Sequence, residues 1–460
     1  MPTLAVTALA LAAFQSYGPV PTTGDPLPRK GVFGLGLTQI PAEVRSQNQI
    51  PAGQGLLATT PVPGQTAAKM GVEAGDILLT VNGQNVAPGV IQEVLRTTSS
   101  GQTLTLQVLR KGERKTLSAP LMEKPRDPGT ADYEVIYSHV ISNGQRMRTI
   151  ITRPRKPGTY PAWFHIQGFS PISYDYVLEG NNEGPTDFQR LNAPMISTFA
   201  KSGFITMRVE KPGVGDSEGG PFAQVDYITE LDIYRQALKQ LKATPGVDPN
   251  NVFIFGHSMG GAFGPMIAAE NKVKGIVTYG TATRTWFEYI LETNRTQSLL
   301  AGATEAQVDD SMRVTSRVLA RIFLENQSPE QVKKELPELA PVVDGLMPGG
   351  LFNQKSVEFW RQLGQINFPR EWSKTGAYVL AVRGVSDFVT YDECHTLIAD
   401  TINRTTPGRG QFLSLPNSDH VMNARATEKE SQQNWPNGNH NPAMTQAMLK
   451  WIREVMAKPN

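Results

Sequence analysis

The sequence has a single cysteine, no dense run of lysine or arginine, and no long apolar stretch beyond its N-terminus. One thiol cannot form an internal disulfide or a cysteine-rich metal site, so we expect Cys394 to be a small buried residue. The net charge of +2 argues against a nucleic-acid or anionic-membrane surface. A membrane-spanning helix needs about 18 or more apolar residues, and we therefore predict no integral membrane span.

A chain of 460 residues, 39% hydrophobic and 19% charged, predicts a soluble globular protein of two or three domains. We expect residues 1–29 to be a signal-like segment followed by a polar linker. Leu4–Phe14 is apolar and has the length typical of the central part of a signal peptide. Ala10-Leu11-Ala12 fits a cleavage pattern, although Met1-Pro2-Thr3 lacks the usual basic residue. These features predict export, to the periplasm or the extracellular space, with a cytoplasmic location as the alternative.

The most informative stretch is Asn251–Gly261, which reads NVFIFGHSMGG. A short apolar run typical of a buried strand precedes the motif G-x-S-x-G, and small apolar residues able to start a helix follow it. A strand, this motif and a helix in succession are the setting of a nucleophile elbow. Side chains two positions either side of Ser258 would collide with the strand and the helix, which predicts the need for Gly256 and Gly260.

Residues 30–123 form a compact block with their own strands and turns. The block opens with Val32–Leu37 (VFGLGL) and contains Ala74–Leu78 (AGDIL) before an Asn-Gly turn. It resembles a PDZ domain in the strand order of HtrA-type bacterial proteases. The resemblance implies that a glycine-rich loop binds the terminal carboxylate of a peptide through its backbone N–H groups. The loop residues are Gly34, Leu35, Gly36 and Leu37.

The alternative for this block is a PDZ-like fold that only docks on the rest of its own chain. Residues 124–130 (KPRDPGT) are predicted to be a linker. From residue 131 to residue 460, strands and helices alternate after an initial hairpin that turns at Asn143-Gly144. This alternation predicts a mostly parallel sheet with an antiparallel start, covered by helices on both faces. An active site is then expected at the carboxyl ends of the strands.

The elbow, together with the Gly-x-Gly-Asp-Ser-x-Gly pattern at Gly213–Gly219, makes residues 131–460 resemble an α/β-hydrolase. Residues 285–375, approximately, interrupt the strand series with four helix-like pieces and no recognisable strand. So long an insertion predicts a helical cap over the serine; a dimerisation arm is the alternative. The expected fold class is therefore α/β, an α/β-hydrolase with a helical cap, preceded by a small mainly-β PDZ domain.

The resemblance implies the chain order serine, acid, histidine. Asp387 follows the next-to-last predicted strand, with Asp392 as the substitute acid. Of the six histidines, only His420 fits by position, just after the last predicted strand, whereas His440 lies further on in a polar Asn-rich loop. The implied catalytic residues are then Ser258, Asp387 and His420. Two backbone N–H groups should bind the oxyanion, one from Met259 and one from Phe169.

These features predict a serine hydrolase, most simply a carboxylesterase acting on small esters through an acyl-enzyme, with no metal and no cofactor. The alternatives are a serine peptidase of prolyl-oligopeptidase-like type and a non-catalytic peptide-binding scaffold. The expected partners are a small-molecule ester and, through the PDZ domain, peptide or protein C-termini. No nucleic acid is expected to bind.

Overall fold

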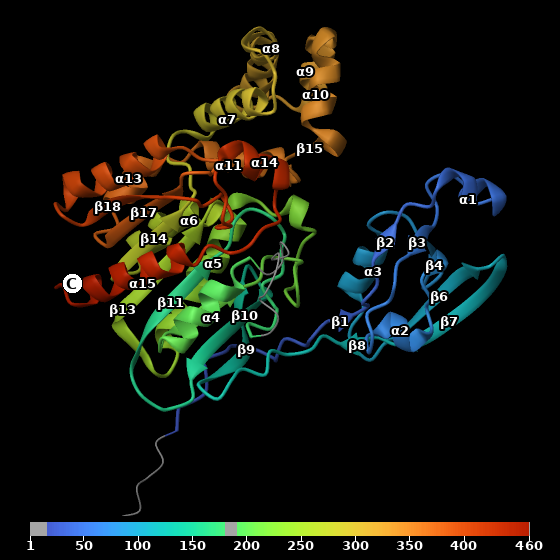
Figure 1. The fold of residues 1–460 in the computed structure, drawn as a ribbon, viewed down its shortest axis with the longest axis horizontal. Coiled ribbons are helices and arrows are strands. Elements are labelled where there is room, and N and C mark those ends of the chain that lie inside the picture. Colours follow the sequence, from blue (N-terminus) through green and yellow to red (C-terminus); the bar gives the residue numbers. More distant parts are fainter. Residues whose placement is uncertain (1–15, 180–190, 460) are drawn as a thin grey trace, which may run out of the picture.

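The computed structural model describes residues 16–179 and 191–459. The expected signal-like run Leu4–Phe14 lies outside the described residues. Two bodies of unequal size are visible in Figure 1, joined by a narrow antiparallel ribbon. The ribbon consists of β1 (Gly31–Val32) and β8 (Met122–Glu123), so the chain enters and leaves the smaller body at the same place.

The smaller body, between β1 and β8, is a twisted antiparallel sheet with short helices. The hydrophobic alternation in β6 explains its main core, because Leu104, Leu106 and Val108 are fully buried while the residues between them are not. The sheet order is β2 (Leu37–Thr38), β3 (Leu56–Ala58), β4 (Ile77–Val81), β6 (Thr103–Arg110) and β7 (Glu113–Pro120), with β5 (Gln84–Asn85) beside β4. The helices are α1 (Ala42–Gln47), α2 (Thr66–Met70) and α3 (Val90–Thr97).

The larger body is built on an eight-stranded sheet. An antiparallel hairpin forms one edge, and the remaining strands run parallel to one another. Four of these strands are wholly or nearly wholly buried, which explains their continuous apolar sequences. The order is β18 (Gly410–Leu415), β17 (Tyr378–Gly384), β14 (Gly275–Tyr279), β13 (Val247–His257), β11 (Tyr160–Ile166), β12 (Ile205–Val209), β10 (Gln145–Pro154) and β9 (Tyr133–Ser142).

Helices cover both faces of this sheet, as Figure 1 shows. Successive strand residues point to opposite faces, so Phe253 and Phe255 enter one core while Ile254 enters the other. The first core is closed by α4 (Ala193–Lys201) and α15 (Pro442–Met456). The second is closed by α5 (Tyr227–Ala243), α6 (Met259–Glu270) and α13 (Asp392–Thr405).

The insertion between β14 and β17 is mainly helical, as expected, and it stands over the helices of the sheet (Figure 1). Its helices are α7 (Trp286–Leu300), α8 (Glu305–Phe323), α9 (Pro329–Glu335), α10 (Ala340–Leu346), α11 (Val357–Gly364) and α12 (Phe368–Ser373). The expectation that it holds no strand is wrong, because β15 (Leu351–Phe352) pairs with β16 (Lys355–Ser356). The turn between them places Asn353 and Gln354 at positive φ, and strands of two residues leave no periodic pattern to recognise.

The segment that precedes the smaller body in the chain packs on the larger body. Residues 17–29 run along its hairpin edge, where His139 and Gln240 hydrogen-bond to their backbone carbonyls. The Arg29 guanidinium is buried between Asp175 and Asp216, at 2.5 and 2.6 Å. Although this stretch reads as a polar linker in sequence, it is part of the larger body's structure.

Candidate active site

Ser258 occupies a strained position between β13 and α6. Its φ of 53° and ψ of −120° are unusual for any residue with a side chain, and its N–H donates to the Tyr279 carbonyl at 2.8 Å. A Cβ on Gly256 would lie 2.6 Å from the Gly260 backbone, and one on Gly260 would lie 2.4 Å from the Ile166 carbonyl oxygen. The two glycines are therefore required by the tightness of the turn.

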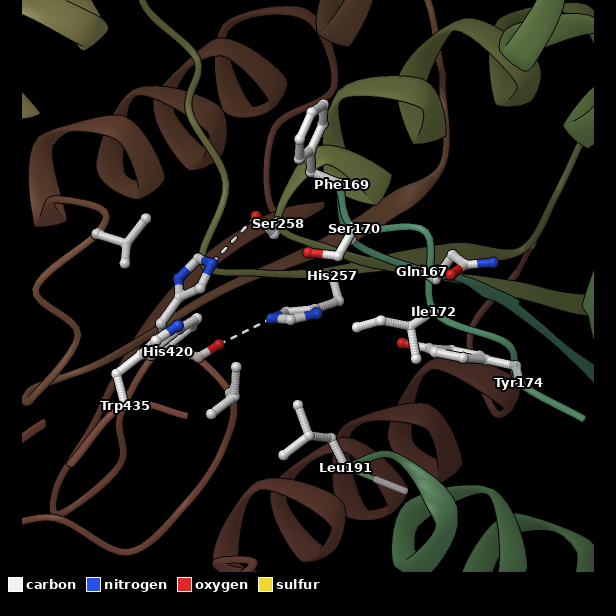
Figure 2. A pocket seen from close by; sticks show the side chains of 13 residues that line it. Gln167, Phe169, Ser170, Ile172, Tyr174, Leu191, His257, Ser258, His420 and Trp435 are labelled. Atoms are coloured by element: carbon white, nitrogen blue, oxygen red, sulfur yellow. Dashed lines mark hydrogen bonds between the residues drawn. The ribbon is translucent and has the colours of Figure 1, made fainter. Parts of the chain in front are cut away.

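The structure brings Ser258, His420 and Asp387 into one hydrogen-bonded line (Figure 2 shows the first two). His420 Nε2 lies 3.0 Å from Ser258 Oγ, and His420 Nδ1 lies 2.9 Å from Asp387 Oδ2. Because a carboxylate only accepts, Nδ1 carries the proton and Nε2 is free to accept the serine hydroxyl. The three residues come from three loops at the carboxyl ends of β13, β17 and β18.

Asp387 is held rigidly for this task. Its Oδ1 accepts from the Val389 and Thr390 N–H groups at 2.7 and 3.0 Å, and its Oδ2 also accepts from Thr390 Oγ1 at 2.6 Å. Burial alone would raise the pKa of Asp387, but the facing His420 and these hydrogen bonds hold it well below its usual range. By contrast, Asp392 begins α13 on the outside and faces Arg383 at 3.4 Å.

Two further histidines support the loops without facing the Ser258 hydroxyl. His257 Nε2 donates to the backbone carbonyl of His420 at 2.8 Å, a contact drawn in Figure 2. Burial lowers the pKa of His257 to about 3, so its ring is neutral. His395, in α13, accepts from the Thr281 N–H at 3.1 Å, and burial lowers its pKa to about 4. Both rings are neutral, and each hydrogen-bonds to the backbone of a residue that lines the site, His420 or Thr281.

The expected oxyanion donors lie on either side of Ser258. Met259 is the first residue of α6, where backbone N–H groups have no partner within the helix. Phe169 follows β11, and Figure 2 shows its main chain passing close to Ser258. The Gln167 side chain turns away and donates to the Val209 carbonyl at 3.2 Å. A side-chain donor from Gln167 therefore does not face the serine.

Two hollows meet at Ser258. The larger, of about 160 Å³, is shown in Figure 2 with its mainly apolar walls. It is lined by Gln167, Gly168, Phe169, Ser170, Ile172, Tyr174, Leu191, His257, Ser258, Val389, His420, Val421 and Trp435. The smaller, of about 50 Å³, is walled partly by the cap through Trp286, Tyr289, Leu363 and Phe368. The cap thus shapes one side of the site.

Two residues that the sequence analysis did not identify hydrogen-bond to expected site residues through their side chains. Thr390 fixes the Asp387 carboxylate, and its place three residues after an acid is a local signal that could have drawn attention to it. Lys211 bonds to the loop that contains Phe169. A lysine two residues after a buried strand carries no pattern that predicts such a contact.

The glycine-rich loop of the smaller body lines a groove of about 610 Å³. Its backbone segment Gly34–Leu37 faces Ile91 and Leu95 of α3 across the groove. Three residues of the larger body, Gly213, Gly215 and Asp216, also line it. The expected peptide-binding loop therefore lies beside the larger body and not on a remote surface.

In the described ranges no group of three or more His, Cys, Asp or Glu side chains could hold a metal ion. Within those same ranges, no helix is long and apolar enough to cross a membrane. The one cysteine, Cys394, is buried, as its sequence context predicted.

Comparison with known families divides the chain as the fold does. Residues 57–110 match the PDZ domain family, and residues 186–335 match a family described as serine aminopeptidase, S33.

Among curated proteins, a probable periplasmic serine endoprotease DegP-like from Bartonella henselae is 28% identical over 107 residues, which is 23% of this chain and 21% of that protein. The uncharacterized peptidase YtmA of Bacillus subtilis is 26% identical over 164 residues, 35% of this chain and 56% of that protein. The chain thus spans between about a fifth and little more than half of these two relatives' length. Among solved structures, an esterase from Pyrococcus furiosus is 13% identical with a TM-score of 0.43, and the match covers 72% of this chain and 97% of that one.

Proposed function

Since the chain is an α/β-hydrolase that carries an N-terminal PDZ domain, we propose that it is a serine hydrolase that cleaves carboxylic esters. The observation that carries the proposal is the hydrogen-bonded line of Ser258, His420 and Asp387 at the carboxyl ends of the parallel strands. A serine hydroxyl is a weak nucleophile near neutral pH, and an imidazole placed at 3.0 Å can remove its proton as it attacks.

In the proposed reaction, Ser258 Oγ attacks the ester carbonyl carbon while its proton passes to His420 Nε2. The carbonyl oxygen becomes an oxyanion, which the N–H groups of Met259 and Phe169 stabilise. His420 then gives its proton to the leaving alcohol, and the acyl group remains on Ser258. Water enters, loses a proton to His420, and releases the acid by the same steps in reverse order. Asp387 holds the imidazole and stabilises its charged form throughout.

The walls of the two hollows favour esters over peptides with a free amino terminus. An aminopeptidase must bind a substrate ammonium group, for which a carboxylate is the natural partner. Of the described residues that line the hollows, none is Asp or Glu, and the charged one is Arg284. The observation that favours a peptidase is the match of residues 186–335 to the serine aminopeptidase family. We therefore keep a serine peptidase as the second candidate.

Profiling the protein on p-nitrophenyl esters of increasing acyl length and on aminoacyl p-nitroanilides tests this choice. We expect Ser258-dependent turnover of the esters that exceeds turnover of the anilides by at least about 10²-fold in kcat/KM. The opposite ratio would establish the peptidase. If neither activity is found and Ser258 does not react with a fluorophosphonate, the remaining alternative is a non-catalytic peptide-binding scaffold.

For the PDZ domain, with proposed bounds 30–123, we propose binding of peptide C-termini through the Gly34–Leu37 loop. The groove beside α3 supports this assignment, because an extended peptide can add to the exposed edge of β2. We also propose an exported protein, since the DegP-like relative is described as periplasmic. Fractionating cells that express the full chain tests the location.

A further inference from the structure

A buried lysine lies directly behind the proposed oxyanion loop. Lys211 follows β12 by two residues, and its side chain is 1% exposed. Its ammonium group makes three short contacts: to the Gly168 carbonyl at 2.6 Å, to the Phe169 carbonyl at 2.8 Å and to Glu230 Oε1 at 2.8 Å. Two of its three partners are therefore main-chain groups of the loop that would donate to the oxyanion.

The first of these contacts bears directly on the expected donor. The Gly168 carbonyl and the Phe169 N–H belong to one peptide group, which is planar and, when trans, points its C=O and N–H in opposite directions. Fixing the carbonyl on Lys211 therefore fixes the direction of the N–H. A cation bound to the carbonyl oxygen also draws electron density from the amide, which makes its N–H a stronger donor.

We propose that Lys211 is a positioning residue of the oxyanion hole, which orients and polarises the Gly168–Phe169 peptide so that its N–H faces the developing charge. This inference rests on the proposed function, in which Ser258 attacks a carbonyl carbon. Lys211 itself does not touch the substrate, because it contacts the loop from behind.

The cost of burying this charge is offset by Glu230. Burial lowers the pKa of Lys211, and the Glu230 carboxylate opposes that shift. Glu230, on α5, also lies 3.4 Å from Lys355 Nζ through its other oxygen. Lys355 belongs to β16 of the cap, where its Nζ donates to the Val225 carbonyl at 2.8 Å. A buried row of three charges thus joins the cap to the oxyanion loop.

Lys355 provides the matched control for Lys211. Both lysines are buried and both pair with Glu230, so Lys211→Met and Lys355→Met each remove one buried cation and leave Glu230 with the other. Only Lys211 bonds to the Gly168 and Phe169 carbonyls. A purely structural role predicts similar effects of the two substitutions on activity per folded molecule.

The experiment measures the rate constant at which a fluorophosphonate modifies Ser258, together with kcat, KM and the melting temperature. Phosphonylation also places a developing oxyanion opposite the same N–H groups, and it does not require an ester substrate.

We expect Lys211→Met to slow phosphonylation and kcat by about 10²-fold, at the lower end of the loss seen when an oxyanion donor is removed. KM should change less than about threefold, since the interaction is made in the transition state. Lys355→Met should lower the melting temperature similarly and reduce both rates less than about fivefold.

Equal rate losses in the two variants, per folded molecule, would overturn the proposal. So would a Lys211→Met variant that loses affinity for substrate while its phosphonylation rate is unchanged. Lys211→Arg retains a cation, and we expect it to recover part of the lost rate. If wild-type Ser258 reacts with the fluorophosphonate but no ester is turned over, the ester assignment fails while the test of Lys211 remains decisive.

Discussion

The Ser258 centre and the PDZ groove are both ligand-facing regions, but they are built from different parts of the chain. In the catalytic centre proposed at Ser258, the reacting groups are side chains, and each is held by hydrogen bonds. In the groove, the proposed peptide-binding groups are backbone N–H groups of the Gly34–Leu37 segment that lines it. A centre of the first kind should fail when one side chain is changed, whereas one of the second kind should tolerate side-chain changes and fail only when its backbone is removed.

The largest expected effect is that of Ser258→Ala. Removing the nucleophile should lower kcat about 10⁵-fold or more and abolish fluorophosphonate labelling. The matched control is Ser170→Ala, because Ser170 lines the same hollow without a place in the hydrogen-bonded line. The control should still be labelled. Labelling of the Ser258 variant at the wild-type rate would remove Ser258 from the proposed centre.

A smaller but still large effect is expected for Asp387→Asn. The amide cannot hold the Nδ1–H tautomer of His420 as a carboxylate does, so kcat should fall about 10⁴-fold, as for the equivalent change in a serine protease, which is a known example. Asp392→Asn, on the outer end of α13, should change kcat less than about threefold. If Asp392→Asn is the more damaging substitution in steady-state assays, the acid has been assigned to the wrong residue.

The groove is tested by removing its backbone. Val32 and Met122 are paired across the β1–β8 ribbon, so a two-residue turn can replace everything between them. This deletion should abolish binding of peptides with free C-termini, measured by fluorescence anisotropy. The deletion should leave kcat/KM on a small ester within about threefold of the wild-type value, because His420 and Asp387, which form the hydrogen-bonded line with Ser258, lie in the larger body.

A chain that begins at Asp127 also lacks the PDZ domain, but it should behave differently. It loses Arg29 and Lys124, which removes both ion-pair partners of Asp175 and leaves Asp216 with Arg148. Breaking a buried pair typically costs about 3–5 kcal/mol, so the melting temperature should fall well below that of the internal deletion. Equal melting temperatures for the two shortened proteins would contradict a structural role for the N-terminal segment.

The smallest expected effect concerns Glu210, a fully buried carboxyl group of the larger body. Its Oε1 accepts from Ser173 Oγ at 2.9 Å, and burial raises its pKa from 4.5 to about 7. Between these values the folded protein binds more protons than the unfolded chain, so the stability contributed by Glu210 falls as pH rises through this window. Glu210→Gln should therefore raise the free energy of unfolding at pH 8 by on the order of 1 kcal/mol or more.

Well below pH 4.5 the gain from Glu210→Gln should vanish, because the wild-type carboxyl is then protonated in both states. Chemical denaturation at about pH 3.5 and at pH 8 measures the difference. Ser173→Ala is a suitable control, since it removes the partner hydroxyl without removing the titrating group. A gain of equal size at both pH values would show that Glu210 does not titrate in this range.

Much of the fold follows from local sequence. The strand before Ser258, the small residues after it and the turn at Asn143-Gly144 each reflect backbone geometry set by neighbouring residues. Three cap helices begin with a local signal of this kind, a capping box at Thr285, Thr304 and Ser328. By contrast, the short β15–β16 hairpin left no periodic signal.

By itself, the sequence determined the two-domain organisation in outline, the elbow and the chain order from which Ser258, Asp387 and His420 were chosen. Only the tertiary structure decided that Lys211 lies behind Gly168, 43 positions earlier, and that Arg29 enters a pair with Asp216, 187 positions later. The reason is physical. Local motifs are fixed by steric limits within a few residues, whereas a buried cation finds its partners through the packing of distant strands, which one sequence does not display.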